Sequence, residues 1–134
     1  MIFQYGNFIL HSGQKSNFKI DCEQYSEDDF ETFARMIAST INFDSVFGIP
    51  KGGSILQNKL EPYRSSFSRR LLIVDDVYTT GKSMEETKTF YSNINKGLKL
   101  NLWDEIKGVV IYARTETPDW IFPIFKLHAN LRNK

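Results

Sequence analysis

The sequence contains one cysteine, Cys22, among its 134 residues. A single cysteine excludes an internal disulfide and a cysteine-rich metal site, as is usual in the reducing cytoplasm, so we expect a cytoplasmic protein. No apolar run approaches the roughly 20 residues of a membrane helix. The first residues also lack the pattern of a signal peptide, and we expect no membrane association. The net charge of only +1 argues against a nucleic-acid partner.

The sequence does contain the ordinary proportions of a soluble globular protein, with 41% hydrophobic and 25% charged residues. Its length fits a single domain spanning residues 1–134. Short apolar runs typical of buried strands occur at residues 45–49, 71–74 and 108–113, with a last extended stretch at 120–127. Helical patterns begin at Ser26, at Ser54 and at Lys82 or Ser83, the last with Gly97 as its C-terminal cap. This alternation predicts an α/β fold with a parallel sheet.

The stretch 70–83 is the most informative part of the chain, because a buried strand leads into two acids, a short polar loop and a helix. A loop that enters a helix N-terminus presents backbone N–H groups and the positive end of the helix dipole. Its hydroxyl groups add donors, and its glycine allows close approach of a ligand. We therefore predict a phosphate site formed by Thr79, Thr80, Gly81, Lys82 and Ser83.

A nucleoside-triphosphate loop is the main competing interpretation, since Gly81-Lys82-Ser83 matches the end of a Walker A motif. That motif requires a glycine five residues before Gly81, and Asp76 occupies this position. A carboxylate there would repel a triphosphate, so we reject it. The remaining alternative is a plain strand–turn–helix connection filled with polar residues.

Asp75 and Asp76 are adjacent carboxylates at the end of a buried strand, where they repel each other and lose hydration. Sugar hydroxyls, a nearby cation or Mg²⁺ would compensate them. Next to a phosphate site, the pair predicts binding of a ribose 5-phosphate. The alternative is that the acids cap the following helix or pair with a surface lysine.

A second anion site is predicted at Pro50-Lys51-Gly52-Gly53, which follows another buried strand. The N–H groups of the two glycines and the charge of Lys51 suit an anion, although a glycine pair is often only a tight turn. Because carboxyl ends of parallel strands share one edge of a sheet, we expect this loop, the acid pair and Arg114 to converge.

These residues resemble those of a known family. Residues 72–83 resemble the phosphoribosyl-pyrophosphate (PRPP) motif of the type I phosphoribosyltransferases. Residues 48–53 look like that family's pyrophosphate loop, in which a non-proline cis peptide is common, and residues 8–18 are similar to the N-terminal hood hairpin of its orotate branch. The resemblance covers about Phe8 to Arg114.

The resemblance implies a three-layer, Rossmann-like fold with a central, mostly parallel sheet. It also implies a hood formed by a hairpin at about 1–24 plus the C-terminal part, and a core at about 25–114. The implied reaction is Mg²⁺-dependent transfer of a phosphoribosyl group from PRPP to a nucleobase, most simply orotate or another pyrimidine, in a homodimer. Its implied residues are Asp75 and Asp76 for catalysis, Thr79 to Ser83 for the 5-phosphate, Pro50 to Gly53 for pyrophosphate, and Phe18, Lys19, Arg114 and His11 for the base. Mg²⁺ would be held through PRPP, with Asp75 as a candidate ligand.

Two of the departures from the family pattern concern the candidate site. Only residues 54–70 fill the interval where the family has a long mobile loop with catalytic Lys and Arg. Lys59, Arg64, Arg69 and Arg70 are candidates to replace those residues. His11 stands where the orotate branch has Lys, and is either a titratable substitute or a surface residue. The alternative function is therefore a PRPP- or nucleotide-binding regulatory module with little or no activity.

Overall fold

The computed structural model describes residues 3–9, 15–20, 25–98 and 102–126, with only the backbone of the first two ranges. Its main sheet has four parallel strands in the order β3-β4-β5-β6. Their bounds are Ser45–Gly48 for β3, Arg70–Tyr78 for β4, Glu105–Ala113 for β5 and Ile121–Lys126 for β6. The predicted α/β fold with a parallel sheet is confirmed.

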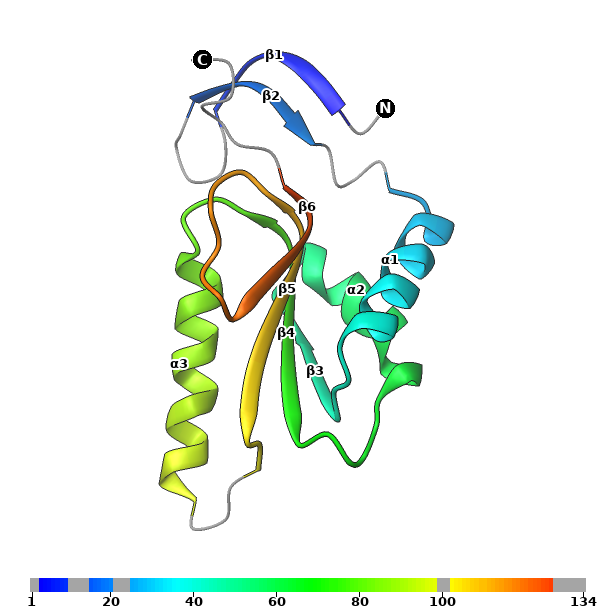
Figure 1. Cartoon of the computed structure of the whole chain (residues 1–134). Helices are drawn as coiled ribbons and strands as arrows, with labels where there is room; N and C mark the ends of the chain where they lie inside the picture. The colour runs from blue at the N-terminus through cyan, green and yellow to red at the C-terminus, as the bar shows by residue number, and fades with distance from the viewer. Residues whose placement is uncertain (1–2, 10–14, 21–24, 99–101, 127–134) are drawn as a thin grey trace.

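Helices cover both faces of this sheet, which gives three layers (Figure 1). Helices α1 (Glu27–Thr40) and α2 (Gly52–Leu60) lie on one face and α3 (Lys82–Gly97) on the other. Each side has its own buried cluster. Leu72, Val74 and Val109 pack with residues of α1 and α2, whereas Ile73 and Val110 pack with Met84 of α3. The strand interiors are thus buried on both faces, as their continuous apolar sequence predicts.

The helix starts follow the local sequence. Ser26 caps α1 in a capping box, because its hydroxyl accepts from the Asp29 N–H at 3.1 Å and Asp29 accepts from the Ser26 N–H at 2.9 Å. Helix α2 begins at Gly52, two residues before the predicted Ser54, so the glycine pair belongs to the helix rather than to a turn. A short 3₁₀ helix, η2 (Glu61–Tyr63), follows α2.

Gly97 is not the C-terminal cap that we predicted for α3, because Leu98 takes that position. It is the last residue of the helix, and Gly81 is the one glycine with positive φ among the residues that the structure describes. The chain leaves α3 in an extended conformation at Leu98, whose N–H donates to the Ile94 carbonyl at 3.2 Å. That bond ends the helix without a left-handed residue.

A separate antiparallel hairpin is formed by β1 (Phe3–Ile9) and β2 (Lys15–Ile20). Its first strand begins at Phe3, whereas the hairpin resemblance starts at Phe8. The sequence also predicts a turn at Ser12-Gly13, which lies outside the described residues. Figure 1 shows the hairpin beyond the carboxyl ends of the main strands. Among the residues described, no helix is long and apolar enough to cross a membrane.

Candidate active site

The acid pair lies inside strand β4 rather than after it. The strand continues four residues past Val74, because β5 runs alongside it as far as the pairing of Tyr78 with Ala113. Neighbouring side chains of a strand point to opposite faces of the sheet. Accordingly, Asp75 lines a cavity beside α3, whereas Asp76 contacts Gly52 at the start of α2.

Within the described part of the chain, no ion pair neutralises the two carboxyl groups. Burial, and after it the hydrogen bond and the negative charge of Asp76, together raise the pKa of Asp75 to about 8. One backbone group partly offsets this effect, because the Asp76 N–H donates to Oδ1 of Asp75 at 2.8 Å. The Val77 N–H donates to Oδ1 of Asp76, also at 2.8 Å. An added cation or a set of hydroxyl donors would stabilise the ionised pair.

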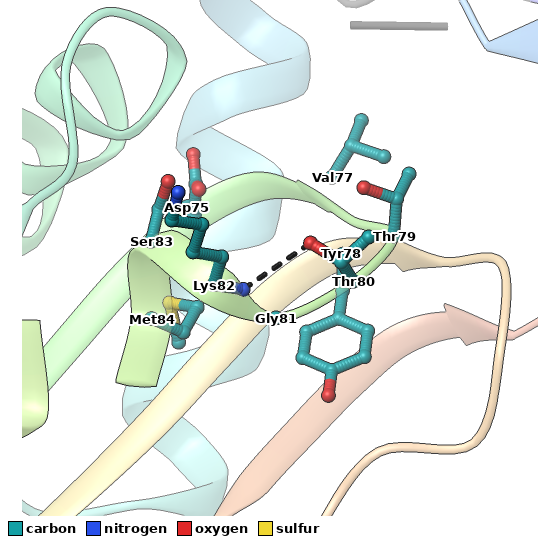
Figure 2. Close-up of a pocket in the computed structure, with 9 residues that line it drawn as sticks. All are labelled: Asp75, Val77, Tyr78, Thr79, Thr80, Gly81, Lys82, Ser83 and Met84. Carbon is teal, nitrogen blue, oxygen red and sulfur yellow. Dashed lines mark hydrogen bonds between the residues drawn. The ribbon is translucent and has the colours of Figure 1, made fainter. Parts of the chain in front are cut away.

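The predicted phosphate loop surrounds a cavity of about 60 Å³ between β4 and α3 (Figure 2). The cavity is lined by Asp75, Val77, Tyr78, Thr79, Thr80, Gly81, Lys82, Ser83 and Met84. All five residues predicted for the 5-phosphate are therefore in one place. The volume is several times the roughly 10–15 Å³ that a cavity needs to hold one water molecule, so a small anion fits.

Helix α3 starts at this cavity, and Gly81 makes the start possible. Gly81 has a φ of 79°, a left-handed conformation, and a Cβ there would lie 2.7 Å from the ring of Tyr78. The first intrahelical bond runs from the Glu85 N–H to the Gly81 carbonyl at 2.9 Å. The N–H groups of the preceding helical residues therefore project from the helix end. One of them, the Lys82 N–H, donates to the Thr80 hydroxyl at 3.4 Å, as the dashed line in Figure 2 shows.

The loop after β3 brings the second predicted anion site to the same place. Its Pro50–Lys51 peptide bond is cis, as the family resemblance led us to expect. The Ile49 N–H donates to the Val74 carbonyl at 2.9 Å. A Cβ on Gly52 would collide with the Asp76 carboxylate. The N-terminus of α2 consequently lies directly against the acid pair.

The predicted base-binding residues are placed only in part. Arg114 follows β5, where its N–H donates to the Tyr78 carbonyl at 3.0 Å and its side chain is buried, with 5% exposed. Phe18 and Lys19 lie on β2, whose side chains are not described, and His11 lies outside the described residues. The structure therefore places Arg114 beside the end of β4. The roles of Phe18, Lys19 and His11 stay predictions.

The four basic residues named as candidates to replace those of the family's mobile loop form ion pairs elsewhere. Arg70 begins β4, five residues before Asp75, a separation of about 16 Å along an extended strand. The ion pairs are Lys59 with Glu27 (2.6 Å), Arg64 with Glu61 (3.2 Å), Arg69 with Asp104 (3.0 Å) and Arg70 with Glu105 (2.6 Å). Arg69 and Arg70 thus lie at the amino-terminal edge of the sheet, opposite the acid pair.

Two residues near the site, Tyr78 and Thr115, were not predicted from the sequence. Tyr78 is 8% exposed and packs beneath Gly81. Thr115 donates its hydroxyl to the Thr79 carbonyl at 3.1 Å. The position of Thr115 directly after the candidate Arg114 was the available hint.

The four-stranded parallel sheet with helices on both faces matches the type I phosphoribosyltransferase fold. Solved structures with this fold include the orotate phosphoribosyltransferase from Aeropyrum pernix, with a TM-score of 0.68 and 19% identity over 98% of this chain and 92% of that one. The Mycobacterium tuberculosis orotate phosphoribosyltransferase in complex with Fe(III) dicitrate gives a TM-score of 0.65 at 13% identity, over 93% of this chain and 89% of that one.

A third similar structure is the Leishmania donovani UMP synthase, with a TM-score of 0.63 and 21% identity over 95% of this chain. This chain spans only 34% of the length of that protein. No family model and no curated protein matches the sequence. At these identities the likeness establishes the fold.

Proposed function

We propose that this protein transfers a phosphoribosyl group from PRPP to a nucleobase, orotate or another pyrimidine, and releases pyrophosphate. The observation that carries the proposal is the position of the acid pair between two helix N-termini. Asp75 lines the cavity at the start of α3, and Asp76 contacts Gly52 at the start of α2. A substrate with a phosphate at one end, a diphosphate at the other and a hydroxylated ring between them matches this arrangement.

The residues divide the work as follows. The loop from Thr79 to Ser83 binds the 5-phosphate, and the loop from Pro50 to Gly53 binds the pyrophosphate group. Asp75 and Asp76 bind the ribose hydroxyls. As the bond to pyrophosphate breaks, positive charge grows on the ribose ring. The fixed carboxylates interact more strongly with that charge than with the neutral ground state, and this difference lowers the barrier.

Magnesium fits this site as a cation shared with the substrate. Within the described part of the chain, no group of three or more acidic, histidine or cysteine side chains could hold a metal ion. Asp75 is a carboxylate whose raised pKa a nearby cation would lower. Bound with the pyrophosphate, Mg²⁺ would supply positive charge to the leaving group.

The base side of the proposal rests on Arg114, with Phe18, Lys19 and His11 as further candidates. Arg114 follows β5 at the same sheet edge as the acid pair. A guanidinium binds a carboxylate through two parallel hydrogen bonds, which suits the carboxylate of orotate. The reaction product would be the corresponding nucleotide.

A PRPP- or nucleotide-binding regulatory module is the second candidate function. The observation in its favour is that the basic residues of the short interval pair with acids away from the site, Arg69 with Asp104 and Arg70 with Glu105. A site that excludes less water stabilises a charged transition state less well. Binding without efficient transfer is the consequence.

Orotate consumption with PRPP and Mg²⁺, followed by its ultraviolet absorbance, tests the proposal. We expect orotate to be consumed by the wild-type protein and not by the Asp76→Asn variant. Uracil and other bases are assayed in parallel by chromatography of the nucleotide product. Calorimetric binding of PRPP with no turnover on any base would reject transfer and support the regulatory module.

A further inference from the structure

The loop between β5 and β6 bonds to the last residue of β4 and to the first residue of the phosphate loop. The Arg114 N–H donates to the Tyr78 carbonyl at 3.0 Å, and the Thr115 hydroxyl donates to the Thr79 carbonyl at 3.1 Å. The first bond extends the contact between β4 and β5, but the second depends on a side chain. We infer that Thr115 is a positioning residue, which holds the phosphate loop in the conformation that binds the 5-phosphate. This inference rests on the proposed function.

The bond from Thr115 fixes the orientation of one peptide group. A peptide unit is planar and trans, so its C=O and its N–H point in opposite directions. With the Thr79 carbonyl directed at Thr115, the N–H of Thr80 must point away from the β5–β6 loop. Thr79 and Thr80 line the cavity, and no residue of the loop at 114–120 does so. The bond thus favours an N–H directed to the side on which the cavity lies.

The same β5–β6 loop also contacts α3 at its far end. The Trp120 Nε1–H donates to Oε1 of Glu85 at 2.9 Å, and Nζ of Lys88 lies 4.7 Å from the centre of the Trp120 ring. The β5–β6 loop therefore contacts both the phosphate loop and helix α3, which follows it. Because Trp120 already secures the loop to α3, loss of the Thr115 hydroxyl should loosen the phosphate loop without releasing the helix.

Two threonines of this loop provide a matched comparison. Thr115→Val keeps the branched shape and removes the hydroxyl that bonds to Thr79, and Thr115→Ser restores a hydroxyl. Thr117→Val removes an equivalent hydroxyl, which donates to the Ile121 carbonyl at 3.2 Å and not to the phosphate loop. The Val variants at 115 and 117 therefore lose the same type of bond at two places in one loop.

Isothermal titration of each protein with ribose 5-phosphate, and separately with Mg²⁺-pyrophosphate, tests the inference. We expect Thr115→Val to weaken ribose 5-phosphate binding by about fivefold, with pyrophosphate binding unchanged. Thr115→Ser and Thr117→Val should bind both ligands like the wild type. Hydrogen exchange of the free protein should be faster at Gly81, Lys82 and Ser83 in Thr115→Val alone.

Equal ribose 5-phosphate affinity in the wild type and Thr115→Val would overturn the inference and leave the proposed function standing. Equal weakening of both ligands would also overturn it, because that is the result of a general loss of structure. A wild-type protein that binds neither ligand would overturn the proposed function, and the inference with it.

Discussion

Asp75 is the residue whose environment says most about this site. It lies on a strand that is buried on both faces, beside a second carboxylate and next to a cavity lined by hydroxyl and N–H donors. Burial and the neighbouring acid raise its pKa to about 8. The protonation of this carboxyl group therefore responds to charges that bind nearby. Such perturbed groups are concentrated at functional sites.

The raised pKa of Asp75 makes stability depend on pH. The folded-state pKa of about 8 exceeds the value of roughly 3.9 in an unfolded chain. The folded protein therefore keeps a proton on Asp75 that the unfolded chain releases. The contribution of this group to stability is fully present below about pH 4 and is lost as the pH rises to about 8. We expect the melting temperature of the wild type, relative to Asp75→Asn, to fall between pH 5 and pH 8. Thermal unfolding followed by circular dichroism measures it, and parallel curves for the two proteins would contradict the account.

Gly52 tests the contact between the predicted pyrophosphate loop and the acid pair. Its Cα lies against the Asp76 side chain, so the methyl group of Gly52→Ala would force the carboxylate to move. We expect a destabilisation of about 1–3 kcal/mol and weaker calorimetric binding of Mg²⁺-PRPP. Gly97→Ala is the control, because a Cβ there meets no atom within 4 Å. Equal PRPP affinity in the two variants would show that Gly52 does not shape the site.

The residues with distinctive chemistry were predictable from the sequence, and their partners were not. Adjacent acids and a hydroxyl-rich loop before a helix predict a ribose-phosphate site, and this prediction does not depend on where the strand ends. The bond from Thr115 to the Thr79 carbonyl joins residues 36 positions apart, and no periodicity predicts it. The ion pairs of Arg69 and Arg70 are equally invisible in the sequence.

Among the elements, the helix that starts at the phosphate loop is the most constrained. Gly81 must adopt a positive φ, and the ring of Tyr78 lies where its Cβ would be. Helix α1 instead starts with an ordinary capping box on Ser26. Substitutions at these two helix starts therefore separate an effect on ligand binding from an effect on stability.

Gly81→Ala and Ser26→Ala form this comparison. We expect Gly81→Ala to destabilise the fold by about 1–2 kcal/mol because of its left-handed backbone, and Ser26→Ala by about 1 kcal/mol because it loses the cap. Only Gly81→Ala should also weaken ribose 5-phosphate binding. Urea unfolding and calorimetry provide the two measurements, and a binding defect in Ser26→Ala would contradict this assignment.

The elements themselves were predicted with errors that have physical causes. The acids made β4 look shorter than it is, since polar residues usually end a buried strand, yet pairing with β5 continues to Tyr78. The glycine pair at 52–53 indicated a turn, but close packing against Asp76 and the Val74 carbonyl requires glycine inside α2. In both places a tertiary contact outweighed local preference.

At the scale of the whole molecule, strand order explains the position of the site. Four parallel strands bring their carboxyl ends to one edge, and both predicted anion loops, the acid pair and Arg114 lie there. The sequence predicted this convergence from the alternation of strands and helices. It did not predict that Arg69 and Arg70 would lie at the opposite edge, because that depends on where β4 begins.

The edge strand β6 is where we predict contact between two copies in a homodimer. Phe122 on this strand is 47% exposed. We expect the wild type to sediment as a dimer in analytical ultracentrifugation and Phe122→Glu to shift toward the monomer. Phe90→Glu is the control, since Phe90 is 59% exposed on α3, on the other face of the sheet. A monomeric wild type would contradict the prediction.

Calorimetric titration of Mg²⁺-PRPP is the most direct test of the central claim, that the acid pair and its two loops form a PRPP site. The wild type should show saturable binding at one site per chain. The double variant Asp75→Asn with Asp76→Asn, with its fold verified by circular dichroism, should lose roughly tenfold or more in affinity, because it loses charged hydrogen bonds to the ribose. Unchanged affinity in the double variant would contradict the site assignment.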